Sequence, residues 1–172
     1  DNSRHKSMVS HYNINDYSDS LKLIKQSYKH YSTLTYEFEF FCIARWFVLN
    51  EFVHRHHINN FFYLDTDVML YTDIEQEFNI YKKYELALTI KPGHHLSASG
   101  HSSLWMNRQI LDDFCNFIMD TYTQNNNEDF VEMINHFQEL QKKGMEGGIC
   151  DMALFYFFYK KKNKRITNLL DE

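Results

Sequence analysis

The feature that most constrains the fold is the run at residues 61–70, FFYLDTDVML, in which two aspartates interrupt an otherwise apolar segment. The unbroken apolar stretch from Phe61 to Leu64 is typical of a strand buried on both faces, as in the middle of a parallel sheet. An unpaired carboxylate is costly in a low-dielectric interior, so we expect Asp65 and Asp67 at the carboxyl end of this strand. Open α/β sheets bind ligands at that edge.

The spacing of the two aspartates indicates a metal. Residues two apart on a strand share a face, so Asp65 and Asp67 are predicted to address one cation together. Mg²⁺ is commonly held by one or two carboxylates, with substrate phosphates filling further positions. The run therefore predicts a metal-phosphate site. The alternative without a function is a strand-end turn whose acids are solvated.

The rest of the chain alternates helical and strand patterns, which predicts a single α/β domain over residues 1–172 with a mostly parallel sheet flanked by helices. Helices are expected over residues 18–28, 35–56, 75–81, 107–122, 130–142 and 152–159. Strands are expected over residues 84–90, 103–106 and 166–170, besides the acidic one. The chain begins with Asp rather than Met, so we expect it to be a fragment of a longer protein that lacks part of its N-terminal fold.

Composition narrows the classes of function. A formal net charge of -5 gives nucleic-acid binding no general electrostatic support. The three cysteines, Cys42, Cys115 and Cys150, have no metal-ligand spacing and suit a reducing, cytoplasmic compartment. No stretch approaches the length of a membrane span. The basic run from Lys160 to Arg165 is most simply a solvated helix end, and a weak peripheral contact with a membrane surface is the alternative.

Arg45 is a second candidate for the site. It lies on the same helical stripe as Phe38, Cys42 and Trp46, so it is predicted on the core-facing side of the helix that precedes the acidic strand. An arginine there needs an anionic partner. That partner is either a structural carboxylate such as Glu39 or a phosphate or sugar held at the acidic strand.

Three ordered landmarks then resemble glycosyltransferases of the GT-A fold, in particular the glycogenin and galactosyltransferase-like group. They are Arg45 some twenty residues before the YLDTDV segment at 63–68, the small-residue segment SGHSSLWMN at 99–107, and the segment GGICDM at 147–152. The resemblance covers residues 38–159. It implies a transferase that moves a hexose-type sugar from a nucleoside-diphosphate donor to a hydroxyl on a glycan, lipid or protein, with Mn²⁺ or Mg²⁺ as cofactor.

The resemblance also implies roles for individual residues. The donor would be bound by Arg45, Asp65, Thr66, Asp67 and Gly100, and the metal by Asp65 and Asp67. Ser99, His101 and Trp105 would lie on the sugar or acceptor side, and Asp151 would be the catalytic carboxylate. The family's first strand, which cradles the base, and its later histidine metal ligand have no placed equivalents.

Two other functions remain open at this point. A haloacid-dehalogenase-type phosphatase also uses an apolar strand followed by Asp-x-Asp, here Asp65 and Asp67. It needs a later acidic pair at a strand end, and Asp112-Asp113 instead falls inside a helical pattern. The non-enzymatic alternative is an inactive transferase domain that acts as a binding module.

Overall fold

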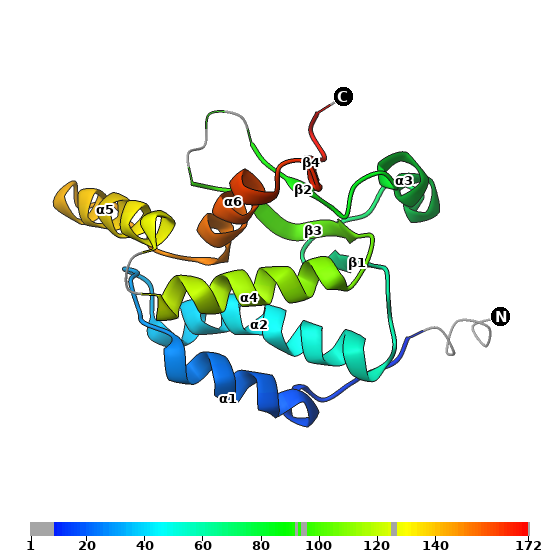
Figure 1. The fold of residues 1–172 in the computed structure, drawn as a ribbon, viewed down its shortest axis with the longest axis horizontal. Helices are drawn as coiled ribbons and strands as arrows, with labels where there is room; N and C mark the ends of the chain where they lie inside the picture. Colours follow the sequence, from blue (N-terminus) through cyan, green and yellow to red (C-terminus); the bar gives the residue numbers. More distant parts are fainter. Residues whose placement is uncertain (1–8, 92, 94–95, 125–126, 172) are drawn as a thin grey trace.

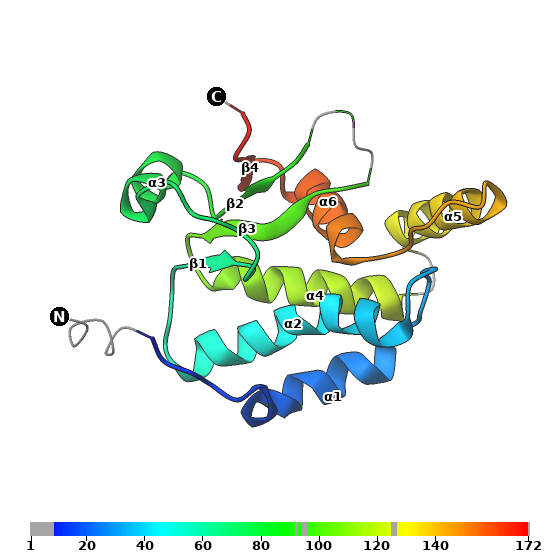
Figure 2. The ribbon, with the colours of Figure 1, turned by 180° about the vertical axis from the view of Figure 1, so that it is seen from behind.

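The structure is a computed structural model that describes residues 9–91, 93, 96–124 and 127–171. It is an α/β arrangement in which helices flank a small mixed sheet (Figures 1 and 2). The elements in chain order are η1 (Ile14–Tyr17), α1 (Ser18–Ser27), α2 (Tyr36–Arg55), β1 (Phe61–Leu64), α3 (Ile74–Tyr81), β2 (Leu86–Thr89), β3 (Ser99–Trp105), α4 (Gln109–Thr123), α5 (Glu128–Lys142), α6 (Asp151–Lys162) and β4 (Ile166–Asn168).

The sheet has four strands in the order β1-β3-β2-β4. Strand β3 runs antiparallel to both β1 and β2, and only β2 and β4 pair in parallel. The expectation of a mostly parallel sheet is therefore wrong. Parallel neighbours need a crossover connection, usually a helix, and the connection between β2 and β3 at residues 90–98 is too short to provide one.

Strand β1 also differs from its expected setting. It lies at the edge of the described sheet, and all four of its residues are half-buried rather than fully buried. The continuous apolar run FFYL therefore does not mark a central strand. Its alternate side chains Phe61 and Tyr63 pack against indole rings: Phe61 stacks on Trp105 at 5.6 Å and Tyr63 lies 4.8 Å from Trp46 between ring centroids.

An aromatic core joins α2, β3, α4 and α6 on one side of the sheet. Trp46, Trp105, Phe114 and Phe155 are all fully buried, and the Phe114 and Phe155 rings stack with centroids 4.0 Å apart. Each such pair contributes about 0.5–1.5 kcal/mol beyond the burial of its area. This cluster fixes how α2 and α6 lie relative to β3, and the candidate site lies at its border.

Helix α2 begins and ends close to the expected limits, and the Thr35 hydroxyl caps it by accepting a hydrogen bond from the backbone N–H of Phe38 at 3.4 Å. Its buried face matches the predicted stripe at Trp46 but differs from it at Phe38. Phe38 is 58% exposed, whereas Phe40, Ile43 and Trp46 are buried. Because almost the whole helix is apolar, the sequence pattern could not select the inward face. Within the described ranges, no helix is long and apolar enough to cross a bilayer.

Candidate functional site

The site is built on one face of the β1–β3 pair. The register places Phe61 opposite Trp105 and Tyr63 opposite Ser103. Side chains alternate between faces, so the next position on this face brings Asp65 opposite His101. The Asp65 backbone N–H donates to the His101 carbonyl at 2.9 Å. The face that builds the core with Phe61 and Trp105 thus carries polar side chains at the carboxyl end of β1.

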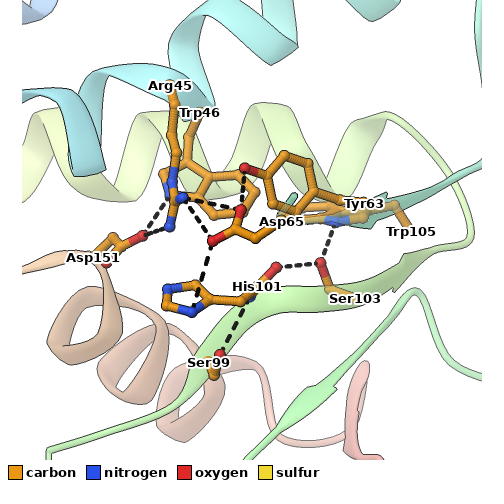
Figure 3. A network of polar contacts seen from close by, with 10 residues as sticks. Arg45, Trp46, Tyr63, Asp65, Ser99, His101, Ser103, Trp105 and Asp151 are labelled. Atoms are coloured by element: carbon orange, nitrogen blue, oxygen red, sulfur yellow. Dashed lines mark hydrogen bonds and ion pairs between the residues drawn. The ribbon is translucent and has the colours of Figure 1, made fainter. Parts of the chain in front are cut away.

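Arg45 reaches down from α2 and joins two carboxylates (Figure 3). Its Nη1 lies 3.1 and 3.2 Å from the two carboxylate oxygens of Asp65, and its Nη2 donates to Asp151 Oδ2 at 2.6 Å. Asp151 comes from the first turn of α6, more than a hundred residues along the chain. The guanidinium is therefore the group that ties the acidic strand to the α6 N-terminus.

Two aromatic donors complete this network. The Tyr63 hydroxyl donates to Asp65 Oδ1 at 2.7 Å, and the Trp46 indole N–H donates to Asp151 Oδ2 at 3.1 Å. The Arg45 guanidinium carbon also lies 5.0 Å from the Trp46 ring centroid and 5.8 Å from that of Tyr63. Each carboxylate thus accepts from Arg45 and from one aromatic side chain, and both rings face the cation.

The surroundings fix the protonation of these groups. Burial acts to lower the pKa of the Arg45 guanidinium, but the charge of Asp151 and its hydrogen bond outweigh burial and raise that pKa above its ordinary value. Burial, together with the hydrogen bond to Asp65, raises the pKa of the Tyr63 phenol well above its ordinary value. Arg45 therefore stays charged and Tyr63 stays a hydrogen-bond donor.

Asp151 is 3% exposed. A carboxylate in a first helical turn often serves the amides of its own helix, yet the hydrogen bonds found for this side chain come from Arg45 and Trp46. His101 approaches from β3, with Nδ1 3.7 Å from Asp65 Oδ2 and two-fifths of its side chain exposed. The structure thus brings together Arg45, Asp65, His101 and Asp151, four of the residues singled out by the sequence.

Asp67 and Thr66 lie apart from this network. The Val68 N–H donates to the Asp65 carbonyl at 3.1 Å, so residues 65–68 form a turn and the alternation of a strand does not continue to Asp67. Asp67 and Thr66 are both exposed. The expectation that Asp65 and Asp67 share a strand face is wrong for this reason, although both carboxylates remain at the same end of β1.

The small-residue segment forms strand β3 from Ser99 to Trp105, longer than the strand expected over residues 103–106, and its residues have different roles. A Cβ on Gly100 would lie 2.5 Å from Phe155 Cε2 and 3.0 Å from Trp46 Cη2, so core packing alone demands glycine here. The Ser99 hydroxyl accepts from the His101 N–H at 3.3 Å. Trp105 is fully buried in the aromatic core. Its expected place on the sugar side is therefore wrong.

Sequence reasoning missed Tyr63 and Trp46. Tyr63 was detectable, because it precedes Asp65 by two positions on the strand and must share its face. Trp46 gave no such signal, because neighbouring positions on a helix point in different directions. Its contact with Asp151 depends on how α6 docks against α2.

A divalent cation fits this site only in part. Among the described residues, no group of three or more His, Cys, Asp or Glu side chains is arranged to hold a metal ion. Asp65 and Asp67 are the carboxylate donors at the end of β1, and Asp65 is already engaged by Arg45 and Tyr63. Hard oxygen ligands suit Mg²⁺ or Mn²⁺, and phosphates of a substrate would have to supply further positions.

The basic run from Lys160 to Arg165 is largely paired with acids. Four cations of the basic run lie within 4.0 Å of acids: Lys160 near Glu132, Lys161 near Asp129, Lys162 near Asp113, and Arg165 near Glu85 and Asp113. This pairing weakens the case for a membrane-surface patch.

The three cysteines, Cys42, Cys115 and Cys150, carry free thiols.

A cavity of about 550 Å³ lies beside the Arg45 stem, between α2 and the η1–α1 segment. Apolar side chains dominate its lining, including Ile14, Phe38 and Phe41. It does not include Asp65, His101 or Asp151 among its lining residues.

Comparison with models of known protein families, with curated proteins and with solved structures finds no match for this chain.

Proposed function

We propose that this domain is a GT-A-like, metal-dependent glycosyltransferase that moves a sugar from a nucleoside-diphosphate donor to an acceptor hydroxyl. The observation that carries the proposal is the junction made by Arg45 between Asp65 and Asp151. Three segments that the resemblance to glycosyltransferases picks out independently in the sequence meet around one guanidinium. His101 lies beside the same Asp65 carboxylate, with Nδ1 3.7 Å from Oδ2.

The chemistry of the residues suits a departing diphosphate. Negative charge develops on the diphosphate in the transition state, and preorganised cations stabilise it. Arg45 has a planar fork of donors that matches phosphate oxygens and remains charged. A divalent cation, when bound with the donor, would supply further charge at the diphosphate. Asp65 and Asp67 would hold that cation.

The remaining residues have roles within reach of the same position. Asp151 is almost fully buried and would orient Arg45, and Trp46 holds the Asp151 carboxylate in place. His101 lies opposite Asp65 and would contact the sugar or the acceptor hydroxyl. Ser99 steadies the backbone at His101, while Gly100 permits β3 to pack against Phe155 and so keeps His101 at this edge. The acceptor in this proposal is a hydroxyl of a glycan, lipid or protein.

The phosphatase alternative receives less support. A nucleophilic Asp65 would need an unhindered carboxylate oxygen, yet both oxygens lie within 3.2 Å of Arg45 Nη1 and one also accepts from Tyr63. The strand that precedes Asp65 is also an edge strand beside an antiparallel neighbour. The free thiols favour a reducing, cytoplasmic setting for the proposed transferase.

The experiment is an assay of nucleotide-sugar hydrolysis, with and without Mn²⁺, over a panel of uridine, guanosine and adenosine diphosphate sugars. The proposal expects release of nucleoside diphosphate from at least one donor, dependent on metal and lost in Asp65→Asn. Binding without turnover would instead favour an inactive transferase module. Stabilisation by beryllofluoride would favour an aspartyl-phosphate and hence the phosphatase.

A further inference from the structure

We propose that Arg45 is an exchangeable counter-cation, which neutralises Asp65 until a divalent cation displaces it and turns it toward the donor diphosphate. This inference rests on the proposed function and adds a rule for binding: cation and diphosphate bind cooperatively, because each removes an obstacle to the other. The residue pair concerned is Arg45 and Asp65, with Asp151 as the anchor that holds Arg45 during the exchange.

The first observation is how fully Arg45 occupies Asp65. One nitrogen, Nη1, lies 3.1 and 3.2 Å from the two carboxylate oxygens, so the guanidinium faces the edge of the carboxylate at which a cation would bind. The Tyr63 hydroxyl takes a further lone pair of Oδ1. A divalent cation that approached Asp65 would meet a resident positive charge.

The second observation is that Arg45 can leave Asp65 and still be held. Its Nη2 donates to Asp151 at 2.6 Å, and the Asp151 side chain is 4% exposed. The Trp46 and Tyr63 rings flank the guanidinium. Arg45 Nε is buried and has no hydrogen-bond partner, so the guanidinium is incompletely satisfied where it lies. A small rotation about Asp151 would free Nη1 for a phosphate oxygen.

The third observation concerns charge. Arg45 is the cation that lies between the Asp65 and Asp151 carboxylates, and Asp67 follows in the exposed turn after Asp65. A diphosphate alone would be repelled by the excess of negative charge, and a metal alone would compete with Arg45. A metal together with a diphosphate meets neither obstacle, since the metal replaces Arg45 at Asp65 and the diphosphate gives Arg45 a new partner.

The test uses the whole chain, with free Mn²⁺ measured by electron paramagnetic resonance in titrations with and without a nucleoside diphosphate chosen from ADP, GDP, UDP and CDP. The variant is Arg45→Met, which keeps the apolar stem. It leaves the buried Asp151 carboxylate unpaired and can fail to fold. The double variant Arg45→Met/Asp151→Asn removes that charge and keeps the test decisive. Arg55→Met, on the same helix, controls for the loss of one positive charge.

The exchange predicts opposite changes in the two titrations. Without nucleotide, removal of Arg45 should tighten Mn²⁺ binding by roughly fivefold or more, the lower end of couplings between linked sites, and Arg55→Met should not. With nucleotide, the unmodified chain should show mutual enhancement of metal and diphosphate binding, and the same variants should lose it. The proposal is overturned if Mn²⁺ alone binds the Arg45 variants as weakly as, or more weakly than, the unmodified chain.

The two proposals can fail separately. If the unmodified chain binds a nucleoside diphosphate with Mn²⁺ but the Arg45 variants gain no affinity for Mn²⁺ alone, the exchange is wrong and the proposed function stands. If no nucleoside diphosphate binds the unmodified chain in the presence of Mn²⁺, the proposed function fails. A gain in Mn²⁺ affinity in the Arg45 variants would then still support Arg45 as the cation that Mn²⁺ displaces.

Discussion

Asp65 and His101 lie opposite each other across the β1–β3 pair, with the Asp65 N–H donating to the His101 carbonyl at 2.9 Å and His101 Nδ1 3.7 Å from Asp65 Oδ2. Backbone pairing fixes this relationship, because the two positions continue the register that places Tyr63 opposite Ser103. The imidazole is therefore held beside the proposed donor site by the sheet itself, and not by a mobile loop.

His101 provides the first prediction. Its side chain is two-fifths exposed, so His101→Gln should change the free energy of unfolding by less than about 0.5 kcal/mol. Turnover of a nucleotide sugar should nevertheless fall by about tenfold or more if the imidazole contacts the reacting sugar. Thermal unfolding and steady-state kinetics together check this. An unchanged kcat/KM in the variant would show that His101 has no role in the reaction.

Asp67 separates a role in binding from a role in folding. It is exposed in the turn after Asp65, so Asp67→Asn should leave the unfolding midpoint unchanged. Metal-dependent binding of a nucleoside diphosphate should weaken by about tenfold, because one of two carboxylate ligands is lost. Calorimetry in Mn²⁺ measures this. Asp73→Asn, a change of an exposed helix-capping aspartate outside the site, is the control; equal affinity in both variants would exclude Asp67 as a ligand.

Glu39 should make stability depend on pH. It is 3% exposed, and burial raises the pKa of its carboxyl above the ordinary value. The pKa of the Glu39 carboxyl is thus higher in the folded than in the unfolded chain. The stability that the protonated carboxyl contributes is therefore fully present at low pH and is lost as pH rises through the folded-state pKa. Glu39→Gln keeps an oxygen acceptor for the Ser32 hydroxyl. It should therefore stabilise the fold at pH 8, because it removes the cost of charging a buried carboxyl group.

The measurement for Glu39 is thermal unfolding at pH 4 and pH 8. The stabilisation by Glu39→Gln should shrink toward pH 4, because the Glu39 carboxyl of the unmodified chain is then protonated and as neutral as the glutamine amide. Glu37→Gln, two residues away and exposed on the same helix, should show no comparable gain. A Glu39 variant that is less stable than the unmodified chain at pH 8 would contradict the account of a buried, protonatable acid.

Gly100 should fail to accept even a methyl group. Its Cβ would lie 2.5 Å from Phe155 Cε2, and overpacking of this kind costs about 1–3 kcal/mol. Phe155→Leu removes the opposing ring edge, so the double variant Gly100→Ala/Phe155→Leu should be more stable than the sum of the two single effects. Denaturant unfolding of the four proteins measures this coupling. Strict additivity would show that the clash is relieved in another way.

Much of the fold could be predicted from the sequence because its helices have clear boundaries. The apolar periodicities of α2, α4 and α5 are local patterns, and these helices form where expected. Strand direction did not follow from pattern. The run FFYL reads as buried on both faces, yet two aromatic side chains that point to one side and pack on indoles are enough to make an edge strand apolar.

The site was predictable where chemistry alone identifies a residue. Arg45 on an apolar helix needed an anion, and the structure gives it Asp65 and Asp151. The sequence could not predict how the helices pack against one another and against the sheet. The contact between Trp46 and Asp151 joins residues 105 positions apart, and Trp105 looked available to a ligand although tertiary packing buries it completely.

The most direct test of the central claim is the position of a bound Mn²⁺ in a crystal structure of the chain with Mn²⁺ and a nucleoside diphosphate, located by its anomalous scattering. We predict a single strong peak at the end of β1, within ligand distance of the Asp65 and Asp67 carboxylates, with the diphosphate bridging the metal and Arg45. The absence of a peak there, with Arg45 still paired to both oxygens of Asp65 while nucleotide is bound elsewhere, would contradict the account.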